Sequence, residues 1–176
     1  MHGGVRFYTD SFNGTLHYAY WFDGVFQVED QTFPGELSGH SSQLDLVNNL
    51  HTYWTSLVPV PGGTVHGIYH QCLYPDLTWG TLSNPSSQAD VGSGPVKAWD
   101  GGNRFGLLWE ESQSQQIRLA IWQGCEQMEQ HIVPFDSGVN RDVSALAISS
   151  VPNKVCALSR KLYTYTYTAL CATINR

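Results

Sequence analysis

Two adjacent glutamates, Glu110 and Glu111, are the strongest enzymatic feature of this sequence, whereas Glu36, Glu126 and Glu129 lie elsewhere. A glycoside hydrolase needs two carboxyl groups that face each other across a cleft, about 5 to 9 Å apart. Adjacent residues of a strand point to opposite faces, so Glu110 and Glu111 cannot form that pair together. We therefore favour a structural role, in which the charges of Glu110 and Glu111 solvate the end of a hairpin. A small β-sandwich glycoside hydrolase using Glu110 or Glu111 is the alternative.

The histidines do not indicate a metal site. His66 and His70 are four residues apart, which on a helix would place two ligands on one face. Their segment has the character of a strand, in which such residues lie about 13 Å apart. The sequence also lacks a G-x-S-x-G turn, a phosphate-binding glycine loop and a dinucleotide-binding fingerprint. We predict a protein that is not an enzyme and that uses no metal and no cofactor.

Four cysteines, Cys72, Cys125, Cys156 and Cys171, are widely spaced and contain no C-x-x-C pair, which disfavours a zinc site. Two disulfides would suit an extracellular setting. Free buried thiols are the interpretation that we favour, because Cys156 and Cys171 lie in apolar, strand-like runs.

Aromatic and amide side chains are the best candidates for a binding site. One face of a sugar stacks on an aromatic ring, and its hydroxyls bond to Asp, Asn or backbone groups. Trp79, Trp99, Trp109 and Trp122 fall within one short span, although each of them is also a candidate for the core. We expect the contact surface in the loops 75–82 and 83–103. The predicted ligand-binding residues are Tyr74, Asp76, Trp79, Trp99, Asp100 and Asn103.

Composition limits the classes of function. The chain has 176 residues, of which 14% are charged and 12% aromatic, and a net charge of −6. This length predicts a single domain, residues 1–176. Nine Lys and Arg residues without a cluster argue against nucleic acid as a partner. No apolar run approaches the roughly 18 residues of a membrane span, so we expect no membrane insertion.

The elements that must position these residues are strands. Runs at 5–9, 15–22 and 25–29 are separated by Asn-Gly and Asp-Gly turns and predict a three-stranded meander. The apolar runs 105–109 and 117–122 flank a polar segment and predict a central hairpin.

One helix is predicted, over about residues 43–57. Ser42 could cap it, and apolar residues recur at spacings of three and four, namely Leu44, Val47, Leu50, Trp54 and Leu57. In residues 162–174 tyrosines and threonines alternate, a period of two that only a strand keeps. The fold class is thus all-β, an antiparallel sandwich or barrel of about ten short strands with one short helix.

In its composition and in the character of its loops, the chain resembles the receptor-binding spike domains on capsids of small non-enveloped viruses, such as astrovirus spikes. The segments SNPSSQADVGSGP and LYTYTYTALCATI have this character. The resemblance implies a non-enzymatic attachment domain at the virion surface, hence extracellular. Its partners would be a host cell-surface glycan or protein receptor, antibodies, and a second copy in a homodimer.

Two other classes remain open. One is a fungal or bacterial lectin, which would use the same aromatic residues. The other is an assembly module, in which the tyrosine face of residues 162–174 pairs with a copy of itself.

Overall fold

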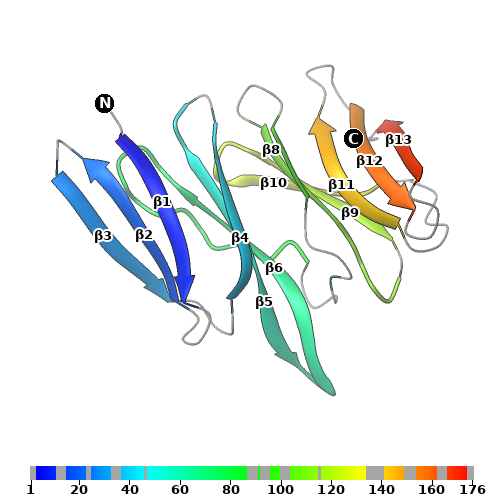
Figure 1. The fold of residues 1–176 in the computed structure, drawn as a ribbon, viewed down its shortest axis with the longest axis horizontal. Coiled ribbons are helices and arrows are strands. Elements are labelled where there is room, and N and C mark those ends of the chain that lie inside the picture. Colours follow the sequence, from blue (N-terminus) through cyan, green and yellow to red (C-terminus); the bar gives the residue numbers. More distant parts are fainter. Residues whose placement is uncertain are drawn as a thin grey trace.

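The computed structural model describes residues 3–10, 15–22, 25–32, 37–45, 47–86, 91, 96–99, 104–114, 116–133, 141–148, 154–161 and 166–173. Within these ranges the chain forms thirteen strands and no helix, arranged as four antiparallel sheets. Figure 1 shows the β1–β3 sheet at one side, the β11–β13 sheet at the other, and the two remaining sheets between them. The same ranges hold no helix that is able to cross a membrane. The prediction of an all-β fold is confirmed, whereas the single helix is not, and the described strands outnumber the ten or so that were predicted.

The N-terminal meander is confirmed. It consists of β1 (Gly3–Asp10), β2 (Thr15–Phe22) and β3 (Val25–Thr32), paired in sequence order. Phe22 pairs directly with Val25, which leaves a two-residue connection, the length for which an Asp-Gly dipeptide is typical.

The predicted helix over 43–57 is wrong. Its residues form the end of β4 (Leu37–Leu44), a turn, and most of β5 (Leu50–Val60), which pairs with β6 (Gly63–Leu73). Ser42 lies inside β4 and caps no helix. The segment HTYWTSLV is rich in β-branched and aromatic residues, and pairing on both sides favours a strand over the helical spacing of its leucines.

Asp45 closes the turn that replaces the helix. Its carboxylate accepts hydrogen bonds from the backbone N–H groups of Val47 and Asn49, at 3.0 and 2.8 Å. It also accepts one from the side-chain amide of Asn49, at 2.8 Å. Asn48 has φ +66°, a left-handed conformation that Asn tolerates better than most residues. An Asp that bonds to its own backbone in this way competes with a helix.

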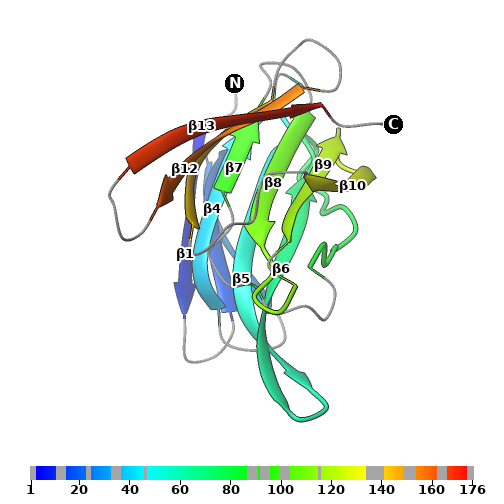
Figure 2. The same ribbon diagram turned by 90° about the vertical axis from the view of Figure 1, so that its right-hand side faces the viewer.

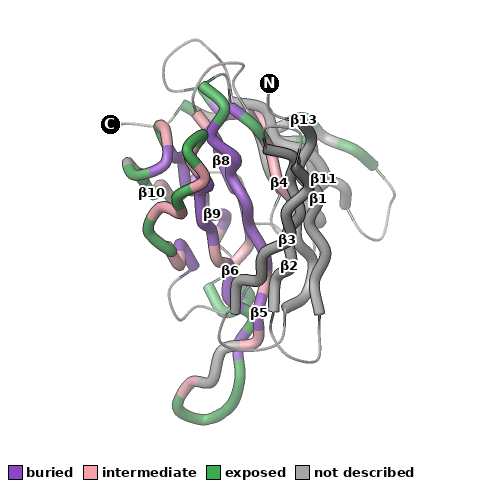
Figure 3. The backbone as a smooth tube through the Cα atoms, turned by 90° about the vertical axis from the view of Figure 1, so that its left-hand side faces the viewer, coloured by how far each residue is buried: buried purple, intermediate pink, exposed green. Residues whose placement is uncertain are grey.

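The central hairpin is confirmed. It is made of β8 (Arg104–Glu110) and β9 (Ile117–Gln123), flanked by β7 (Val96–Trp99) and β10 (Gln127–Val133). Figure 2 shows these four strands side by side, in the order β7, β8, β9, β10. The central strands β8 and β9 are mostly buried, whereas the edge strand β10 is largely exposed (Figure 3).

The remaining sheet contains β11 (Arg141–Ile148), β12 (Lys154–Lys161) and β13 (Thr166–Thr173). β13 covers the described part of the predicted strand 162–174. β11 lies against β7 and β8, so this sheet adjoins the β7 edge of the central one.

The β4–β6 sheet and the β7–β10 sheet share a core. Its buried side chains come from β5, β6, β8, β9 and one connecting segment, and they are Tyr53, Ile68, Val91, Phe105, Leu107, Trp109, Ala120 and Trp122. Trp109 and Trp122 are therefore core residues and cannot contact a ligand.

The preference for free thiols is wrong. Cys72 at the end of β6 is bonded to Cys125 in the β9–β10 turn, and Cys156 is bonded to Cys171, its direct neighbour across β12 and β13. The strand-like runs that suggested buried thiols place Cys156 and Cys171 opposite each other, so that the same pattern produces a cross-strand pair.

Candidate functional site

The loop that follows β6, residues 74–80, is a compact and well-bonded unit, here named the Tyr74 loop. The N–H of Tyr74 donates to the carbonyl of Thr78, and the N–H of Leu77 donates to the carbonyl of Tyr74, both at 2.9 Å. The N–H of Gly80 returns to the carbonyl of Cys72 at 2.8 Å. Each bond fixes the backbone from which the exposed side chains project.

Asp76 and Thr78 form a polar corner on this loop. The carboxylate of Asp76 accepts hydrogen bonds from the Thr78 hydroxyl, at 2.6 Å, and from the Thr78 N–H, at 3.0 Å. These two bonds lower the pKa of Asp76, the hydroxyl having the larger effect. Both side chains are exposed, so an ionised carboxylate with free lone pairs faces solvent at neutral pH.

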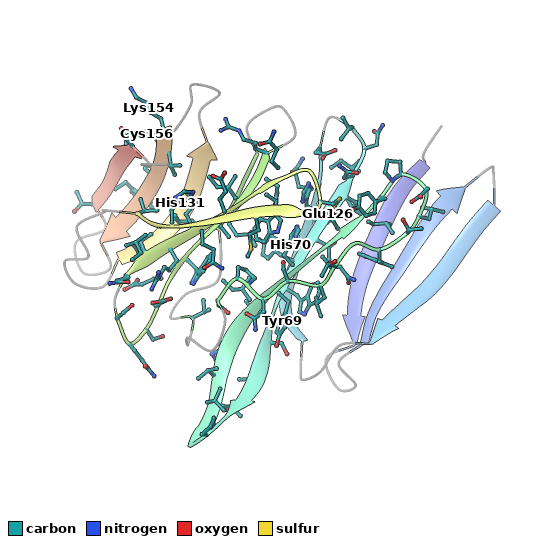
Figure 4. All side chains as sticks on the ribbon, turned by 180° about the vertical axis from the view of Figure 1, so that it is seen from behind. Tyr69, His70, Glu126, His131, Lys154 and Cys156 are labelled. Atoms are coloured by element: carbon teal, nitrogen blue, oxygen red, sulfur yellow. A yellow bond between two sulfur atoms is a disulfide. The ribbon has the colours of Figure 1, made fainter. Side chains whose placement is uncertain are left out.

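Tyr74 is tied to the neighbouring sheet. Its hydroxyl donates to Oε1 of Glu126 at 2.7 Å, and this bond is the main reason that the pKa of Tyr74 is raised. Glu126 is exposed in the β9–β10 turn, next to Cys125, which is bonded to Cys72. Figure 4 shows Glu126 at one end of β10, beside the end of β6. The disulfide thus brings two distant segments together.

Trp79 is half-buried at the end of the same loop and forms a bridge to Leu73. The side-chain amide of Gln71 donates to the carbonyl of Gly80 at 2.9 Å and holds this end in place. The Tyr74 ring lies against Gly80, because a Cβ there would be 3.4 Å from Cε2 of Tyr74. Half-buried Tyr74 and Trp79 and exposed Asp76, Thr78 and Glu126 form one group, which we name the Tyr74–Glu126 patch.

The structure brings together three of the six residues expected to bind a ligand, Tyr74, Asp76 and Trp79. Trp99 ends β7, where its backbone pairs with Phe105 at the opposite edge of the central sheet from β10. Asp100 and Asn103 lie outside the described residues. Glu126 was not predicted as a binding residue. Only the pairing of Cys125 with Cys72 could have indicated it, because the two segments are far apart in sequence.

The segment expected to provide a long contact loop, 83–103, is partly buried in its described residues. Ser83 pairs with His70, and the N–H of Ile68 donates to Oγ of Ser86 at 2.8 Å. Val91 is buried and pairs with Glu111. These residues cover the edge of β6 and are not free to contact a large ligand.

Glu110 and Glu111 are placed differently from a catalytic pair. Arg118 contacts Oε1 of Glu111 at 3.0 Å, and the Ser114 hydroxyl donates to Oε2 at 2.7 Å. Glu111 therefore holds the hairpin loop together. Burial raises the pKa of Glu110, which lies at the end of β8 opposite Ile117.

A chain of polar groups lies in the core, where β5 and β6 pack against β8 and β9. His51 Nδ1 lies 3.1 Å from His70 Nε2, and His51 Nε2 lies 3.5 Å from Oδ2 of Asp45. Both rings are buried, and the centroid of the His70 ring lies 4.0 Å from that of the Trp122 ring. Burial lowers the pKa of His51 despite Asp45, and burial together with His51 lowers that of His70 further.

This chain is not arranged for nucleophilic catalysis. The Ser83 hydroxyl donates to the carbonyl of His70 at 3.2 Å and lies 3.5 Å from Nδ1 of the same ring. A nucleophile needs its proton directed at the base. Within the described ranges there is also no group of three or more His, Cys, Asp or Glu side chains able to hold a metal ion.

No protein-family model matches the chain, and comparison with curated proteins and with solved structures finds no match.

Proposed function

We propose that this protein is a non-catalytic attachment domain that binds a neutral glycan of a receptor through the Tyr74–Glu126 patch. In this proposal the sheets pack as a β-sandwich and present the patch at one edge. The resemblance of the sequence to capsid spike domains supports a place on a virion surface, with antibodies as further partners.

The observation that carries the proposal is the hydrogen bond between Tyr74 and Glu126, beside the Cys72–Cys125 disulfide. It holds an aromatic ring and a carboxylate in a fixed relation on an exposed surface. A site whose parts are already ordered loses less conformational entropy when a ligand binds.

The chemistry of the patch suits a sugar. The rings of Tyr74 and Trp79 can stack against the C–H face of a pyranose. The carboxylates of Asp76 and Glu126 accept hydrogen bonds from sugar hydroxyls, and charged acceptors form stronger bonds than neutral ones. Two exposed carboxylates also repel sialic acid and sulfate groups, which makes a neutral sugar the expected ligand.

The two disulfides support an extracellular setting, because such bonds form and persist in oxidising compartments. A surface domain that meets receptors outside the cell agrees with this chemistry.

A glycan array that carries matched neutral and sialylated members tests the proposal. We expect binding to neutral members, reduced about tenfold or more in Trp79→Ala and Tyr74→Ala. Tyr167→Ala is the matched control, since Tyr167 is an exposed tyrosine on β13, and its binding should equal that of the wild type.

The same array with Trp99→Ala tests separately whether the β7 edge contributes to glycan binding. Binding to sialylated members alone, or normal binding by Trp79→Ala and Tyr74→Ala, would refute the proposal. A receptor that keeps its affinity after removal of all glycans would identify a protein ligand instead.

A further inference from the structure

The edge strand β10 is unusual for an exposed edge. It is the last strand of the central sheet, and no described strand lies on its outer side. Proteins usually protect such an edge with Lys, Pro or a bulge. The strand QMEQHIV contains neither Lys nor Pro, and it pairs with β9 without a register shift.

The exposed side chains of β10 are apolar at two positions. Met128 is 38% exposed and Ile132 is 55% exposed. Because residues 128, 130 and 132 alternate with 129 and 131, Met128 and Ile132 lie on one face of the sheet, on either side of Gln130. Glu129 and His131 lie on the other face, again on either side of Gln130.

This arrangement is self-complementary. If two copies of β10 pair antiparallel about a two-fold axis at Gln130, Met128 of each copy lies opposite Ile132 of the other. Glu129 of each copy then lies opposite His131 of the other. Apolar cross-strand pairs stabilise a sheet, and like charges in direct opposition destabilise it.

Neighbouring registers lack this property. A two-fold axis normal to the sheet keeps each side chain on its own face, so the register shifts in steps of two residues. An axis at residue 129 would place Glu129 opposite itself, and an axis at residue 131 would do the same for His131. Only the axis at Gln130 brings Glu129 and His131 together.

Of the two side chains on this face, Glu129 is the accessible one. The Glu129 side chain is 53% exposed, whereas His131 is 14% exposed and its Nε2, which lies 3.4 Å from Oε2 of Glu129 in its own chain, is buried. An axis at Gln130 keeps the two Glu129 carboxylates of a dimer apart. Gln130 at the axis is already occupied, because its side-chain amide donates to the carbonyl of Pro85 at 2.9 Å. It therefore holds the strand in place.

We propose that β10 is the interface of a homodimer, in which two copies of this chain pair antiparallel about Gln130 to form one continuous sheet. This interface goes beyond the glycan site and does not depend on it. It also differs from the assembly module left open by the sequence, in which the tyrosine face of residues 162–174, a segment that includes β13, pairs with a copy of itself.

The test is sedimentation equilibrium over a range of protein concentrations. We expect a monomer–dimer equilibrium whose dissociation constant rises about tenfold or more in Ile132→Lys. Val47→Lys is the matched control, because Val47 is 56% exposed in the β4–β5 turn, and its equilibrium should match that of the wild type. Circular dichroism confirms that both variants are folded.

Charge exchange provides a second measurement, read for variants that circular dichroism shows to be folded. His131→Glu alone places two carboxylates opposite each other and should weaken the dimer. Combining it with Glu129→Lys places opposite charges across the interface and should recover the dimer. A monomeric wild type, a dimer unaffected by Ile132→Lys, or one dissociated by Tyr167→Lys on β13 would overturn the proposal.

Discussion

His51 Nδ1 lies 3.1 Å from Nε2 of His70 in the core between the two central sheets, with both rings buried. One nitrogen must donate and the other accept, so at least one of the two rings at this contact is neutral. If His51 carries its proton on Nε2, towards Asp45, then Nδ1 accepts from the Nε2–H of His70. This tautomer satisfies the most contacts.

The histidine pair predicts acid sensitivity. Both pKa values are lowered in the folded state, so between pH 6.5 and the lowered folded values the unfolded chain binds more protons than the native one. The free energy of unfolding therefore decreases as the pH falls through this window, by about 1.4 kcal/mol per pH unit for each histidine. Urea unfolding at a series of pH values measures this slope.

His70→Phe keeps a flat ring against Trp122 and should remove the share of His70 from that slope. His66→Gln is the control for replacing a histidine of the same strand, because His66 is exposed. A wild-type free energy of unfolding that stays constant from pH 7 to pH 5 would contradict the prediction.

Asp45→Ala should destabilise the protein strongly. It leaves the N–H groups of Val47 and Asn49 without their acceptor and removes the buried carboxylate beside His51. We expect a loss of about 3 kcal/mol in the free energy of unfolding. Asp76→Ala, at an exposed turn of similar type, should change stability much less. Equal losses in the two variants would show that burial at Asp45 contributes nothing.

The two disulfides should differ in their effect on binding. In the chain-entropy account, loss of Cys72–Cys125, with a separation of 53 residues, costs about 4 kcal/mol, and loss of Cys156–Cys171, with 15, about 3 kcal/mol. Only the first pair joins Tyr74 to Glu126. The double variant Cys72→Ala/Cys125→Ala should therefore weaken glycan binding when folded, whereas Cys156→Ala/Cys171→Ala should not.

The Tyr74–Glu126 bond gives a subtler prediction. Tyr74→Phe keeps the ring and removes the hydroxyl, while Glu126→Gln keeps an acceptor and removes the charge. We expect Tyr74→Phe to lower glycan affinity severalfold, and less than Tyr74→Ala, because the ring still stacks. Titration calorimetry with the best neutral glycan measures both variants. If Tyr74→Phe and Tyr74→Ala bind equally well, the ring has no part in recognition.

Hydrolysis should be absent. Glu111 is held by Arg118 and Ser114, so Glu111→Gln should lower the free energy of unfolding by about 1 kcal/mol without changing binding. A panel of polysaccharides incubated with the wild type should release no reducing sugar. Release that is abolished in Glu110→Gln or Glu111→Gln would support the glycoside hydrolase instead.

Local turn chemistry and a period of two made much of the fold predictable. The Asp-Gly dipeptide at residues 23–24 and the alternation in 117–122 both correspond to pairings in the structure. The prediction of a helix over residues 43–57 was wrong because Leu50, Trp54 and Leu57 fit a helical spacing by coincidence. Their pairing with β4 and β6 is a long-range contact that no local pattern contains.

The candidate site was predictable only in part, for the same physical reason. Tyr74, Asp76 and Trp79 belong to one short segment, so their aromatic and acidic character could be read locally. Glu126 joins them through a disulfide between residues 53 positions apart. Which of the four cysteines pair as disulfides depends on the folded chain, and their spacing in the sequence alone does not determine it.

The Cys72–Cys125 bond encloses β7, β8 and β9 within one covalent ring. A protease that hydrolyses a single peptide bond between residues 80 and 124 opens this ring but releases nothing, because the two fragments stay joined through sulfur. The Tyr74 loop would remain on one fragment and Glu126 on the other, still linked. Nicked protein would thus remain one covalently linked species until a reductant separates its two fragments.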